Sequence, residues 1–487
     1  MGGFHIEHFG CRAARADGEA IAGHLRAMAE GHPLASDVVV VNTCSVTAEA
    51  DRAARAYIRR AHRKNPAAKI VVTGCYAQRA PEELATMPGV AAVVGNSHKA
   101  LAPEIIFRLS RGASEAPAPL SAFVPIASLL SAGAPQAGGV SAPVWADDNF
   151  AHSFLEDTQL APGAQTRPNL KVQEGCGNRC TFCVIPFTRG PSRSLPAASV
   201  LRHIGGFVES GGKELVLSGI NLGRWGRDLS TGFGRQPLAG LVRAIFERTA
   251  LPRLRLSSIE PMDWDDELIA LLGEYGSSRM PESPRTGSGP WGGRLCRHAH
   301  LPLQSGSDAV LRRMHRRYRP WHYAGKVAAL ERAAGKDLTL GADVMAGFPG
   351  ETDHEFEETL AFIRELPFGY LHLFPFSPRP GTPGFALHAG SPVPVAVVDE
   401  RMAALRALAA EKTRAHRSRF VGRELAAITL HTQGLSAAQG CTAALTENFL
   451  PVELDGRLAA NKLVWVRITG LDPDGALHGR ERALETP

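Results

Sequence analysis

The chain has 487 residues, a formal net charge of +6, and 44% hydrophobic and 21% charged residues. This is ordinary globular composition, and the length predicts about three domains. No run of about 18 apolar residues occurs, which excludes a membrane-spanning helix, and MGGFHIEHFG lacks the apolar core of a signal peptide. The spacing of the eight cysteines does not suggest a secreted disulfide framework, so we expect a cytoplasmic protein.

Short apolar runs of strand type alternate with helical patterns in the first hundred residues. The runs cover residues 4–9, 37–42, 69–73 and 90–94, and the helical patterns cover residues 17–30, 48–64 and 81–87. This alternation predicts an α/β domain over residues 1–110, built on a doubly wound parallel sheet.

A cysteine lies within a few residues of the end of each of the first three predicted strands: Cys11, Cys44 and Cys75. The carboxyl ends of parallel strands meet at one edge of a sheet, which is where ligands bind in such folds. We therefore expect three thiols to converge there. The alternative is that three buried cysteines act as small hydrophobic side chains.

The next segment, residues 111–166, is rich in Ala, Pro, Gly and Ser, with APAP, SAGAPQAGG and LAPGAQ. This composition predicts a linker, although residues 144–155 could dock against a neighbour. Residues 277–293 form a second irregular insert, which we expect to be a surface loop. Six further strands alternate with helices over residues 167–400: 170–172, 214–218, 253–257, 300–302, 339–345 and 370–374.

A second cysteine triplet, Cys176, Cys180 and Cys183 in GCGNRCTFCVIP, follows the first of these strands with the spacing C-x3-C-x2-C. A structural zinc site needs four protein ligands, whereas a [4Fe–4S] cluster held by three cysteines keeps one iron open for chemistry. The alternative is a zinc knuckle completed by a distant histidine such as His203. We favour the cluster because no second C-x2-C or H-x3-H follows nearby.

Basic residues gather in two places. The first group lies on one face of the predicted helix over residues 48–64, and the second follows LPLQSGSD. Both are predicted to bind a phosphate backbone, or else they are solvated helix faces. By contrast, residues 420–487 carry six basic and eight acidic residues, a poor general RNA clamp, after a basic helical connector over residues 401–419. The residues that we single out for RNA binding are Arg52, Arg55, Arg59, Arg63, Arg312 and Arg316.

The chain resembles the methylthiotransferases, a family of radical S-adenosylmethionine (SAM) enzymes with two [4Fe–4S] clusters. The matching segments are VNTCSVTAEADRAARAYIRRA, VVTGCYAQ, GCGNRCTFCVIPFTRGPSRS, LSGINLGRWGRDL, LPLQSGSDAVLRRMHRRY, GADVMAGFPGET and LFPFSPRPGTP. The resemblance implies that the first triplet binds an auxiliary cluster and the second the radical-generating cluster, whose open iron chelates SAM. It also implies a partial six-stranded (β/α) barrel and a C-terminal TRAM-like β-barrel over residues 420–487.

Within the barrel, the resemblance and the positions after strands suggest groups that contact SAM. Their roles as ordinary turn residues stay open, and Asp343 could instead only cap or orient a neighbour. These groups are Ser218, Gly219, Asn221, Ser257, Glu260, Asp343, Gly347 and Gly350. Cys296 and Cys441 match no cluster position, so we expect both to be structural.

The segments NTCSVTAEADR, FTRGPSRS and SGINLGRWGRDL look most like one branch of this family. That branch converts N6-threonylcarbamoyladenosine, beside the anticodon of tRNA, to its 2-methylthio derivative. The implied partners are the tRNA anticodon arm and a flavodoxin- or ferredoxin-type electron donor. The alternatives are a methylthiotransferase acting on N6-isopentenyladenosine or on a ribosomal-protein aspartate, and, more remotely, an iron–sulfur RNA-binding protein without turnover.

Overall fold

A computed structural model of the protein describes residues 3–29, 37–111, 141–150, 166–231, 234–276, 288–289, 292–438 and 440–482. The chain forms two compact units. Unit 1 comprises Met1–Thr158, Glu174–Arg193 and Ser377–Phe385, and unit 2 comprises Gln159–Gln173, Ser194–Phe376 and Ala386–Pro487. The loop with the second cysteine triplet therefore groups with the N-terminal residues, although the barrel strand that precedes it lies almost entirely in unit 2.

The sheet of unit 1 is parallel throughout, in the order β1-β2-β3-β4-β5. Its strands are β1 (Phe4–His8), β2 (Val38–Thr43), β3 (Lys69–Gly74), β4 (Val90–Gly95) and β5 (Val144–Trp145). The four strands predicted in this region are confirmed, and β5 is part of the segment that we expected to dock. Strands rich in Val and Ile suit a sheet that is buried on both faces.

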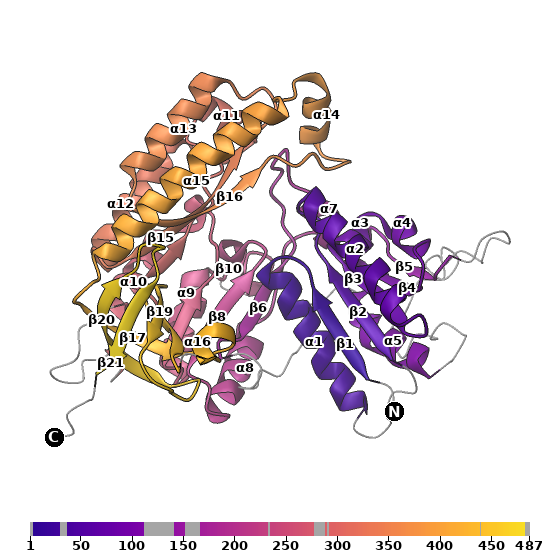
Figure 1. Cartoon of the computed structure of the whole chain (residues 1–487), viewed down its shortest axis with the longest axis horizontal. Helices are drawn as coiled ribbons and strands as arrows, with labels where there is room; N and C mark the ends of the chain where they lie inside the picture. Colours follow the sequence, from indigo (N-terminus) through magenta and orange to yellow (C-terminus); the bar gives the residue numbers. More distant parts are fainter. Residues whose placement is uncertain are drawn as a thin grey trace. The chain divides into compact units, whose positions relative to one another are not determined.

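Helices cover both faces of this sheet, as predicted for a doubly wound domain (Figure 1). Helices α1 (Arg12–Ala29) and α5 (Ala102–Ser110) pack on one face, and α2 (Ala48–Lys64), α3 (Cys75–Arg79) and α4 (Pro81–Ala85) pack on the other. The 3-10 helix η1 (Asn96–Leu101) precedes α5, and α7 (Ile185–Arg189) follows the second cysteine triplet. Helix α1 begins before the predicted residue 17, because Ala13 and Ala14 already lie in the core.

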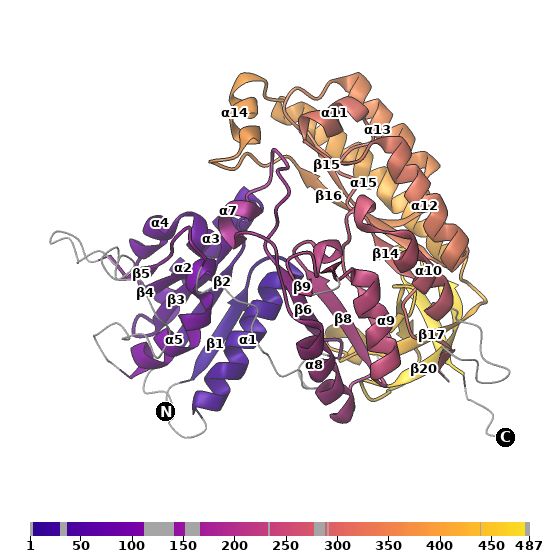
Figure 2. The same cartoon turned by 180° about the vertical axis from the view of Figure 1, so that it is seen from behind.

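Unit 2 contains the six predicted barrel strands, with helices outside them (Figure 2). Two of the sheets have the orders β11-β8-β6-β7 and β14-β15-β16, and parallel bridges from Leu254 to Leu295 and from Ser258 to His300 connect them. In the described part of the chain β16 does not pair with β6, so the barrel is open. The strands are β6 (Asn169–Glu174), β7 (Arg193–Ser194), β8 (Glu214–Gly219), β11 (Arg253–Leu256), β14 (His298–His300), β15 (Thr339–Ala346) and β16 (Phe368–Pro375).

Several helices and small hairpins accompany these strands. The helices are α8 (Ala197–Glu209), α9 (Leu238–Arg248), α10 (Asp266–Tyr275), α11 (Asp308–Arg313), α12 (Pro320–Ala334), α13 (Asp353–Glu365), α14 (Pro383–Gly390), α15 (Val395–Ser418), η2 (Leu222–Arg224) and η3 (Pro261–Asp263). The hairpins pair β9 (Ser230–Thr231) with β10 (Gly234–Arg235) and β12 (Ser288–Gly289) with β13 (Gly292–Gly293). Most of the predicted linker and of the second insert lies outside the described residues. No described helix is both long and apolar enough to cross a membrane.

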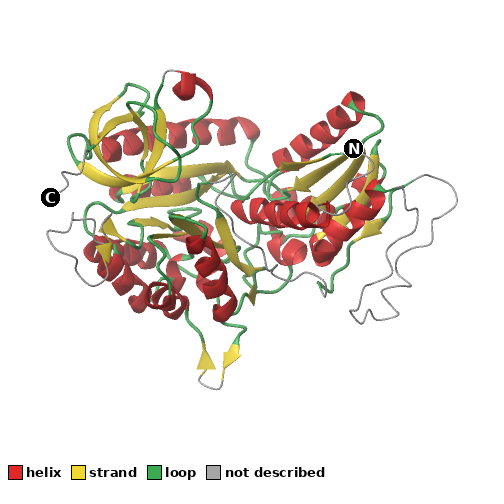
Figure 3. Cartoon of the chain, turned by 90° about the horizontal axis from the view of Figure 1, so that it is seen from below, coloured by secondary structure: helices red, strands yellow, loops and turns green. Residues whose placement is uncertain are grey.

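The C-terminal residues form the small closed β-barrel that the family resemblance implied (Figure 3). Its strand order is β17-β18-β19-β21-β20. The elements are β17 (Glu424–Thr429), α16 (Gly434–Ala438), β18 (Thr442–Thr446), β19 (Pro451–Leu454), β20 (Leu463–Leu471) and β21 (Leu477–Glu481). Leu425, Val452, Val464 and Ile468 fill its centre, together with other apolar side chains of the strands.

A buried carboxylate joins two strands of unit 2. Glu214 begins β8 and pairs in register with Arg253 on β11. It accepts hydrogen bonds from Arg255 Nε at 3.0 Å and Arg167 Nη1 at 3.3 Å, and Arg253 Nη1 lies 3.5 Å away. Burial alone would raise the pKa of Glu214, but the three guanidinium groups lower it to about 2.

Glu214→Gln should lower the free energy of unfolding at pH 7 by about 3–5 kcal/mol, because three guanidinium groups lose their counter-charge. The folded-state pKa lies below the ordinary 4.5, so this stabilisation is complete above pH 4.5 and is lost as the pH falls toward 2. Urea unfolding followed by tryptophan fluorescence at several pH values measures it. Glu357→Gln is the control, because Glu357 is exposed on α13. Equal urea midpoints of unfolding for the two variants would contradict the prediction.

Candidate metal centre

Glycines bring the first three cysteines to one edge of the unit 1 sheet. Cys44 directly follows β2, Cys75 opens α3 directly after β3, and Cys11 lies between β1 and α1. Gly10 has a φ of +113°, and a Cβ there would lie 2.4 Å from Cys44 Cβ and 2.7 Å from its sulfur. Gly74 has a φ of +99°, and its Cβ would lie 2.3 Å from the Thr43 carbonyl oxygen. Only glycine permits such approaches.

The three sulfurs influence one another electrostatically. Burial, together with the neighbouring Cys75 and Cys11, raises the pKa of the Cys44 thiol to about 12. A thiol in such surroundings stays protonated until a positive charge stabilises the thiolate. The site therefore favours a cationic ligand that shares all three sulfurs.

Arg189 at the end of α7 supplies a fixed positive charge beside this triplet. Its Nε donates to Cys75 Sγ at 3.2 Å, and its Nη1 donates to Asp17 Oδ2 at 3.0 Å and Glu174 Oε1 at 2.5 Å. Burial would lower the pKa of Arg189, but the charges of Cys75, Glu174 and Asp17 hold it well above its usual value. Arg189 therefore stays charged although it is fully buried.

Lys99 on η1 completes a buried network of four charges with Arg189, Asp17 and Glu174. Its ammonium lies 3.2 Å from Asp17 Oδ1 and 3.1 Å from Glu174 Oε2. Each of the four residues is at most 3% exposed. Two cations and two anions compensate one another, so the group connects α1, η1, the end of β6 and α7 without a net buried charge.

The second cysteine triplet lies on the loop after β6, and backbone hydrogen bonds connect residues within this loop. Cys176 N–H donates to the Gly190 carbonyl at 3.1 Å, and Cys183 N–H donates to the Cys180 carbonyl at 3.1 Å. Gly175 has a φ of +72°, and a Cβ there would lie 2.0 Å from the Pro191 oxygen. The three thiols are partly exposed.

Both triplets suit clusters better than single ions. A tetrahedral zinc ion bound at about 2.3 Å places its sulfurs about 3.8 Å apart. Neither triplet gathers three ligand atoms within 4.8 Å of one another, whereas in a cubane each cysteine binds a different iron and the sulfurs lie farther apart.

Buried donors beside the first triplet also fit a cluster. Arg189 Nη2 and Arg379 Nε and Nη1 have no hydrogen-bond partner among the described residues. Arg379 is held by Asp51 Oδ2 at 2.8 Å, and its charge interacts with that of Cys44. Such donors can bond to cluster sulfurs and so stabilise a bound cluster.

The two remaining cysteines belong to unit 2. Cys296 is fully buried, and burial raises the pKa of its thiol to about 12. Cys441 is partly exposed and lies at the start of β18. The structural role that we expected for both stays a prediction.

Most residues predicted to contact SAM lie on turns after the strands of unit 2. Asn221 N–H donates to Gln173 Oε1 at 2.7 Å, and a Cβ at Gly219 would lie 2.9 Å from Gln173 Cβ. Ser218 Oγ donates to the Leu170 carbonyl at 3.4 Å, and Ser257 Oγ is buried without a partner among the described residues. The segment that contains Ser218, Gly219 and Asn221 therefore packs against β6.

The other predicted SAM contacts have partners within unit 2. Gly347 N–H donates to Glu351 Oε2 at 2.7 Å, and Gly350 N–H donates to the Ser391 carbonyl at 2.9 Å. Asp343 lies between two histidines, His300 and His372.

The second predicted basic group is largely neutralised by carboxylates. Arg316 is buried and donates from Nη2 to Glu260 Oε2 at 2.6 Å. The expected phosphate contact of Arg316 is therefore wrong, because a carboxylate already occupies its guanidinium. Arg312 is exposed but pairs with Asp308 at 2.8 Å.

The first predicted basic group presents cations to solvent along α2. Arg59 and Arg63 are exposed and make no ion pair with any described residue. Arg52 is exposed and pairs with Glu49. Arg55 instead donates to Tyr76 Oη at 2.5 Å and Glu83 Oε1 at 3.1 Å. The accessible part of this face is thus Arg52, Arg59 and Arg63.

Comparisons with known proteins agree with this architecture. A family model described as the radical SAM superfamily matches residues 170–363, and one described as uncharacterized protein family UPF0004 matches residues 3–95. The threonylcarbamoyladenosine tRNA methylthiotransferase MtaB of Bacillus subtilis (strain 168) is 33% identical over 86% of this chain and 82% of its own length. MtaB of Rickettsia prowazekii (strain Madrid E) is 30% identical over 96% and 95%.

Two further proteins are similar to this chain. The tRNA-2-methylthio-N(6)-dimethylallyladenosine synthase of Cereibacter sphaeroides (strain ATCC 17025 / ATH 2.4.3) is 34% identical over 86% of this chain and 85% of its own length. Among solved structures, the radical SAM methyltransferase TsrM of Kitasatospora setae aligns at 17% identity and a TM-score of 0.47, over 72% of this chain and 64% of that chain.

The family matches, together with the open barrel and the two cysteine triplets, define a radical SAM enzyme. The chain belongs to the radical SAM methylthiotransferase family, whose MtaB members it matches over most of their length.

Sequence reasoning missed the charged residues that support the cysteines. Arg189 stands in the segment FTRGPSRS, six residues after Cys183, which is a usable signal. Asp17 begins a predicted helix and Lys99 lies outside the predicted elements, and at both positions a charge usually indicates a solvated surface, so no local signal distinguishes them. The pattern HAH at residues 298–300 places histidines on one face of a strand and was also overlooked.

Gly10→Ala should disrupt the first triplet without removing a sulfur, because its Cβ would lie 2.4 Å from Cys44 Cβ and its φ is +113°. Anaerobically reconstituted protein should fall from about eight to about four iron atoms per chain. Gly23→Ala on α1 is the matched control, since nothing lies within 4 Å of its Cβ. Full iron content with an unchanged visible spectrum in Gly10→Ala would contradict the prediction.

Proposed function

We propose that the protein converts N6-threonylcarbamoyladenosine beside the tRNA anticodon to its 2-methylthio derivative. The observation that carries this proposal is the similarity to MtaB proteins of five bacteria, at 30–33% identity over 82–99% of their lengths. The arrangement of unit 1, with one cysteine triplet at a sheet edge and another on the loop after β6, supports the two-cluster chemistry that this conversion requires.

Two [4Fe–4S] clusters, when bound, supply reductive cleavage of SAM and transfer of the methylthio sulfur. Cys176, Cys180 and Cys183 hold the first, and their number leaves one iron without a protein ligand for SAM. Cys11, Cys44 and Cys75 hold the second. The charged Arg189 donates a hydrogen bond to the sulfur of Cys75. Gly10 and Gly74 let the backbone come close to Cys44 and Thr43, which positions the sulfurs.

Eight residues within or after the strands of unit 2 remain our proposed SAM contacts: Ser218, Gly219, Asn221, Ser257, Glu260, Asp343, Gly347 and Gly350. Small residues permit close approach of the backbone, and the buried Ser257 hydroxyl offers a hydrogen bond that the protein itself does not use. We also propose a reducing cytoplasmic setting and a flavodoxin- or ferredoxin-type electron donor, because exposed thiols and clusters persist under reducing conditions.

The tRNA anticodon arm is the proposed macromolecular substrate. Arg52, Arg59 and Arg63 on α2 give an exposed row of cations at spacings of four and seven residues along one helix face. Cations spaced in this way along one face can contact several phosphates of a nucleic-acid backbone. Exposed Arg312 adds a weaker candidate, since Asp308 compensates its charge.

N6-isopentenyladenosine is the second candidate substrate. The Cereibacter sphaeroides protein, named for a dimethylallyladenosine product, is 34% identical to this chain. Its matched part covers 86% of this chain, as do those of two MtaB relatives, whereas three other MtaB relatives match 95–96%. The five MtaB matches, three of them over nearly the whole chain, are our reason for placing threonylcarbamoyladenosine first.

A nucleoside mass profile of tRNA from a deletion strain tests the substrate. Threonylcarbamoyladenosine should accumulate and its 2-methylthio derivative should disappear, while the isopentenyl counterpart stays unchanged. The wild-type gene should restore the product, and Cys176→Ala should not. Loss of the methylthio isopentenyl nucleoside would instead assign the second candidate, and an unaltered tRNA profile with a lighter ribosomal protein would overturn both.

Arg59→Glu should weaken tRNA binding, because it replaces an exposed phosphate-binding cation with an anion. The slope of log K against log salt should become shallower by about one unit. Arg406→Glu on α15 changes the same charge at another exposed position and serves as the control. Equal binding curves for the two variants would show that α2 does not contact tRNA.

A further inference from the structure

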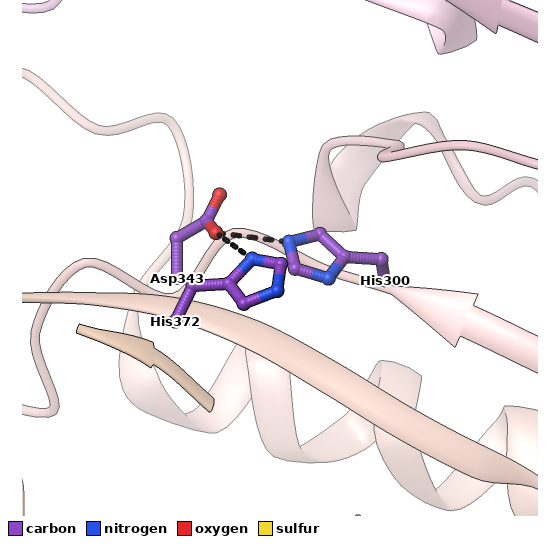
Figure 4. Close-up of side chains that lie close together, drawn as sticks. All are labelled: His300, Asp343 and His372. Atoms are coloured by element: carbon purple, nitrogen blue, oxygen red, sulfur yellow. Dashed lines mark hydrogen bonds and ion pairs between the residues drawn. The ribbon is translucent and has the colours of Figure 1, made fainter. Parts of the chain in front are cut away.

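Two histidines and an aspartate converge on one face of the β14-β15-β16 sheet (Figure 4). His300 pairs in register with Gly341, and Asp343 pairs with His372. Gly341 and Asp343 are two residues apart on β15, so they share a face of the sheet. The strand register therefore places His300, Asp343 and His372 together from three neighbouring strands.

The distances between their ligand atoms suit a single metal ion. Asp343 Oδ1 lies 3.1 Å from His300 Nε2 and 3.2 Å from His372 Nδ1. All three atoms lie within 4.8 Å of one another, and among the described residues this is the group that meets that spacing. A metal bound at about 2.0–2.2 Å places adjacent nitrogen and oxygen ligands about 3–3.4 Å apart.

A second set of hydrogen bonds orients His300. Its Nδ1 lies 3.0 Å from the Tyr370 hydroxyl, which in turn lies 2.8 Å from His298 Nε2. In the metal-free protein His300 Nε2–H donates to Asp343. When a metal ion replaces this proton, Nδ1–H can donate to the phenol oxygen while the phenol donates to His298, which keeps the Nε2 lone pair directed at the ion. Histidines that bind metals are commonly fixed in this way through their other ring nitrogen.

Gly341 makes this support possible. A Cβ at this position would lie 2.1 Å from Tyr370 Cζ and 2.3 Å from its hydroxyl oxygen. Because Gly341 has no side chain, Tyr370 on β16 crosses over β15 and reaches His300 on β14. Phe449 of the C-terminal barrel packs against the rings of His298 at 4.4 Å and Tyr370 at 5.4 Å, which fixes the arrangement further.

His300 is buried, whereas Asp343 and His372 are accessible to solvent. The side chain of His300 is 8% exposed, that of Asp343 24% and that of His372 53%. Burial would raise the pKa of Asp343, but hydrogen bonds from both histidines hold it below its usual value, so the carboxylate is charged. An ion can enter from solvent, and three protein ligands leave positions for water or another oxygen ligand.

We propose that His300, Asp343 and His372 bind one divalent transition-metal ion, apart from the iron–sulfur clusters, which assigns Asp343 to this ion in place of SAM. Two imidazoles and one carboxylate suit Zn²⁺ or Fe²⁺, and they lack the oxygen-rich set that Ca²⁺ and Mg²⁺ require. This site is independent of the proposed tRNA substrate, because it rests only on residues of unit 2.

Zinc binding to the anaerobically reconstituted full-length protein tests the site. Iron is measured in parallel, so that the cysteines are known to hold their clusters. Wild type should bind one equivalent of Zn²⁺ after dialysis, measured by elemental analysis, and His300→Ala/His372→Ala should lose it. His354→Ala is the control, because this histidine is exposed on α13 and pairs with Glu358. Equal zinc content in wild type and the double variant would overturn the proposal.

Two further measurements do not depend on the folding of that double variant. Gly341→Ala keeps all three ligands but displaces Tyr370, so it should weaken zinc binding about 10–100-fold with iron unchanged. X-ray absorption at the zinc edge of the wild type should show nitrogen and oxygen ligands alone. A sulfur shell would place the zinc at cysteines and would overturn the proposal, as would zinc affinity unchanged in Gly341→Ala.

Discussion

The four buried charges of Arg189, Lys99, Asp17 and Glu174 set the constraint on which both cysteine triplets depend. Each belongs to a different element, and none is more than 3% exposed, so each must remain beside its partners. Removal of one partner from such a group costs about 3–5 kcal/mol, because an uncompensated charge is left in the protein interior. The loop of the second triplet is thereby fixed against the helix and sheet that carry the first. The charged Arg189 also donates a hydrogen bond directly to the sulfur of Cys75.

Much of the fold was predictable because its strands are short apolar runs with clear boundaries. Val38–Thr43, Lys69–Gly74 and Glu214–Gly219 lie within one residue of their predicted limits. The start of α1 was missed, because Ala13 and Ala14 carry no periodic signal and are buried only through tertiary packing. The grouping of residues 174–193 with the N-terminal sheet was also not predictable, since it arises from ion pairs between residues more than seventy positions apart.

The cysteines were found from sequence because thiols are rare and their spacing restricts the ligand. Their charged neighbours were not, because Lys99 and Asp17 look like ordinary surface residues until their burial is known. The opposite error occurred at Arg316, which belongs to a run of arginines but is neutralised by Glu260, 56 residues earlier in the chain. Local sequence shows which charges are present, and only the tertiary structure shows which ones are already paired.

Unit 1 is built from three segments that are far apart in the sequence, so its parts leave the ribosome at different times. Its sheet is complete early in synthesis, yet Arg189 arrives later, and Arg379 lies 328 positions after its partner Asp51. Until those residues emerge, Asp17 lacks the partner Arg189, and Asp51 pairs with Arg79 but not yet with Arg379. The N-terminal sheet can therefore form early, but its cysteine-bearing edge is completed only when most of the polypeptide has been translated.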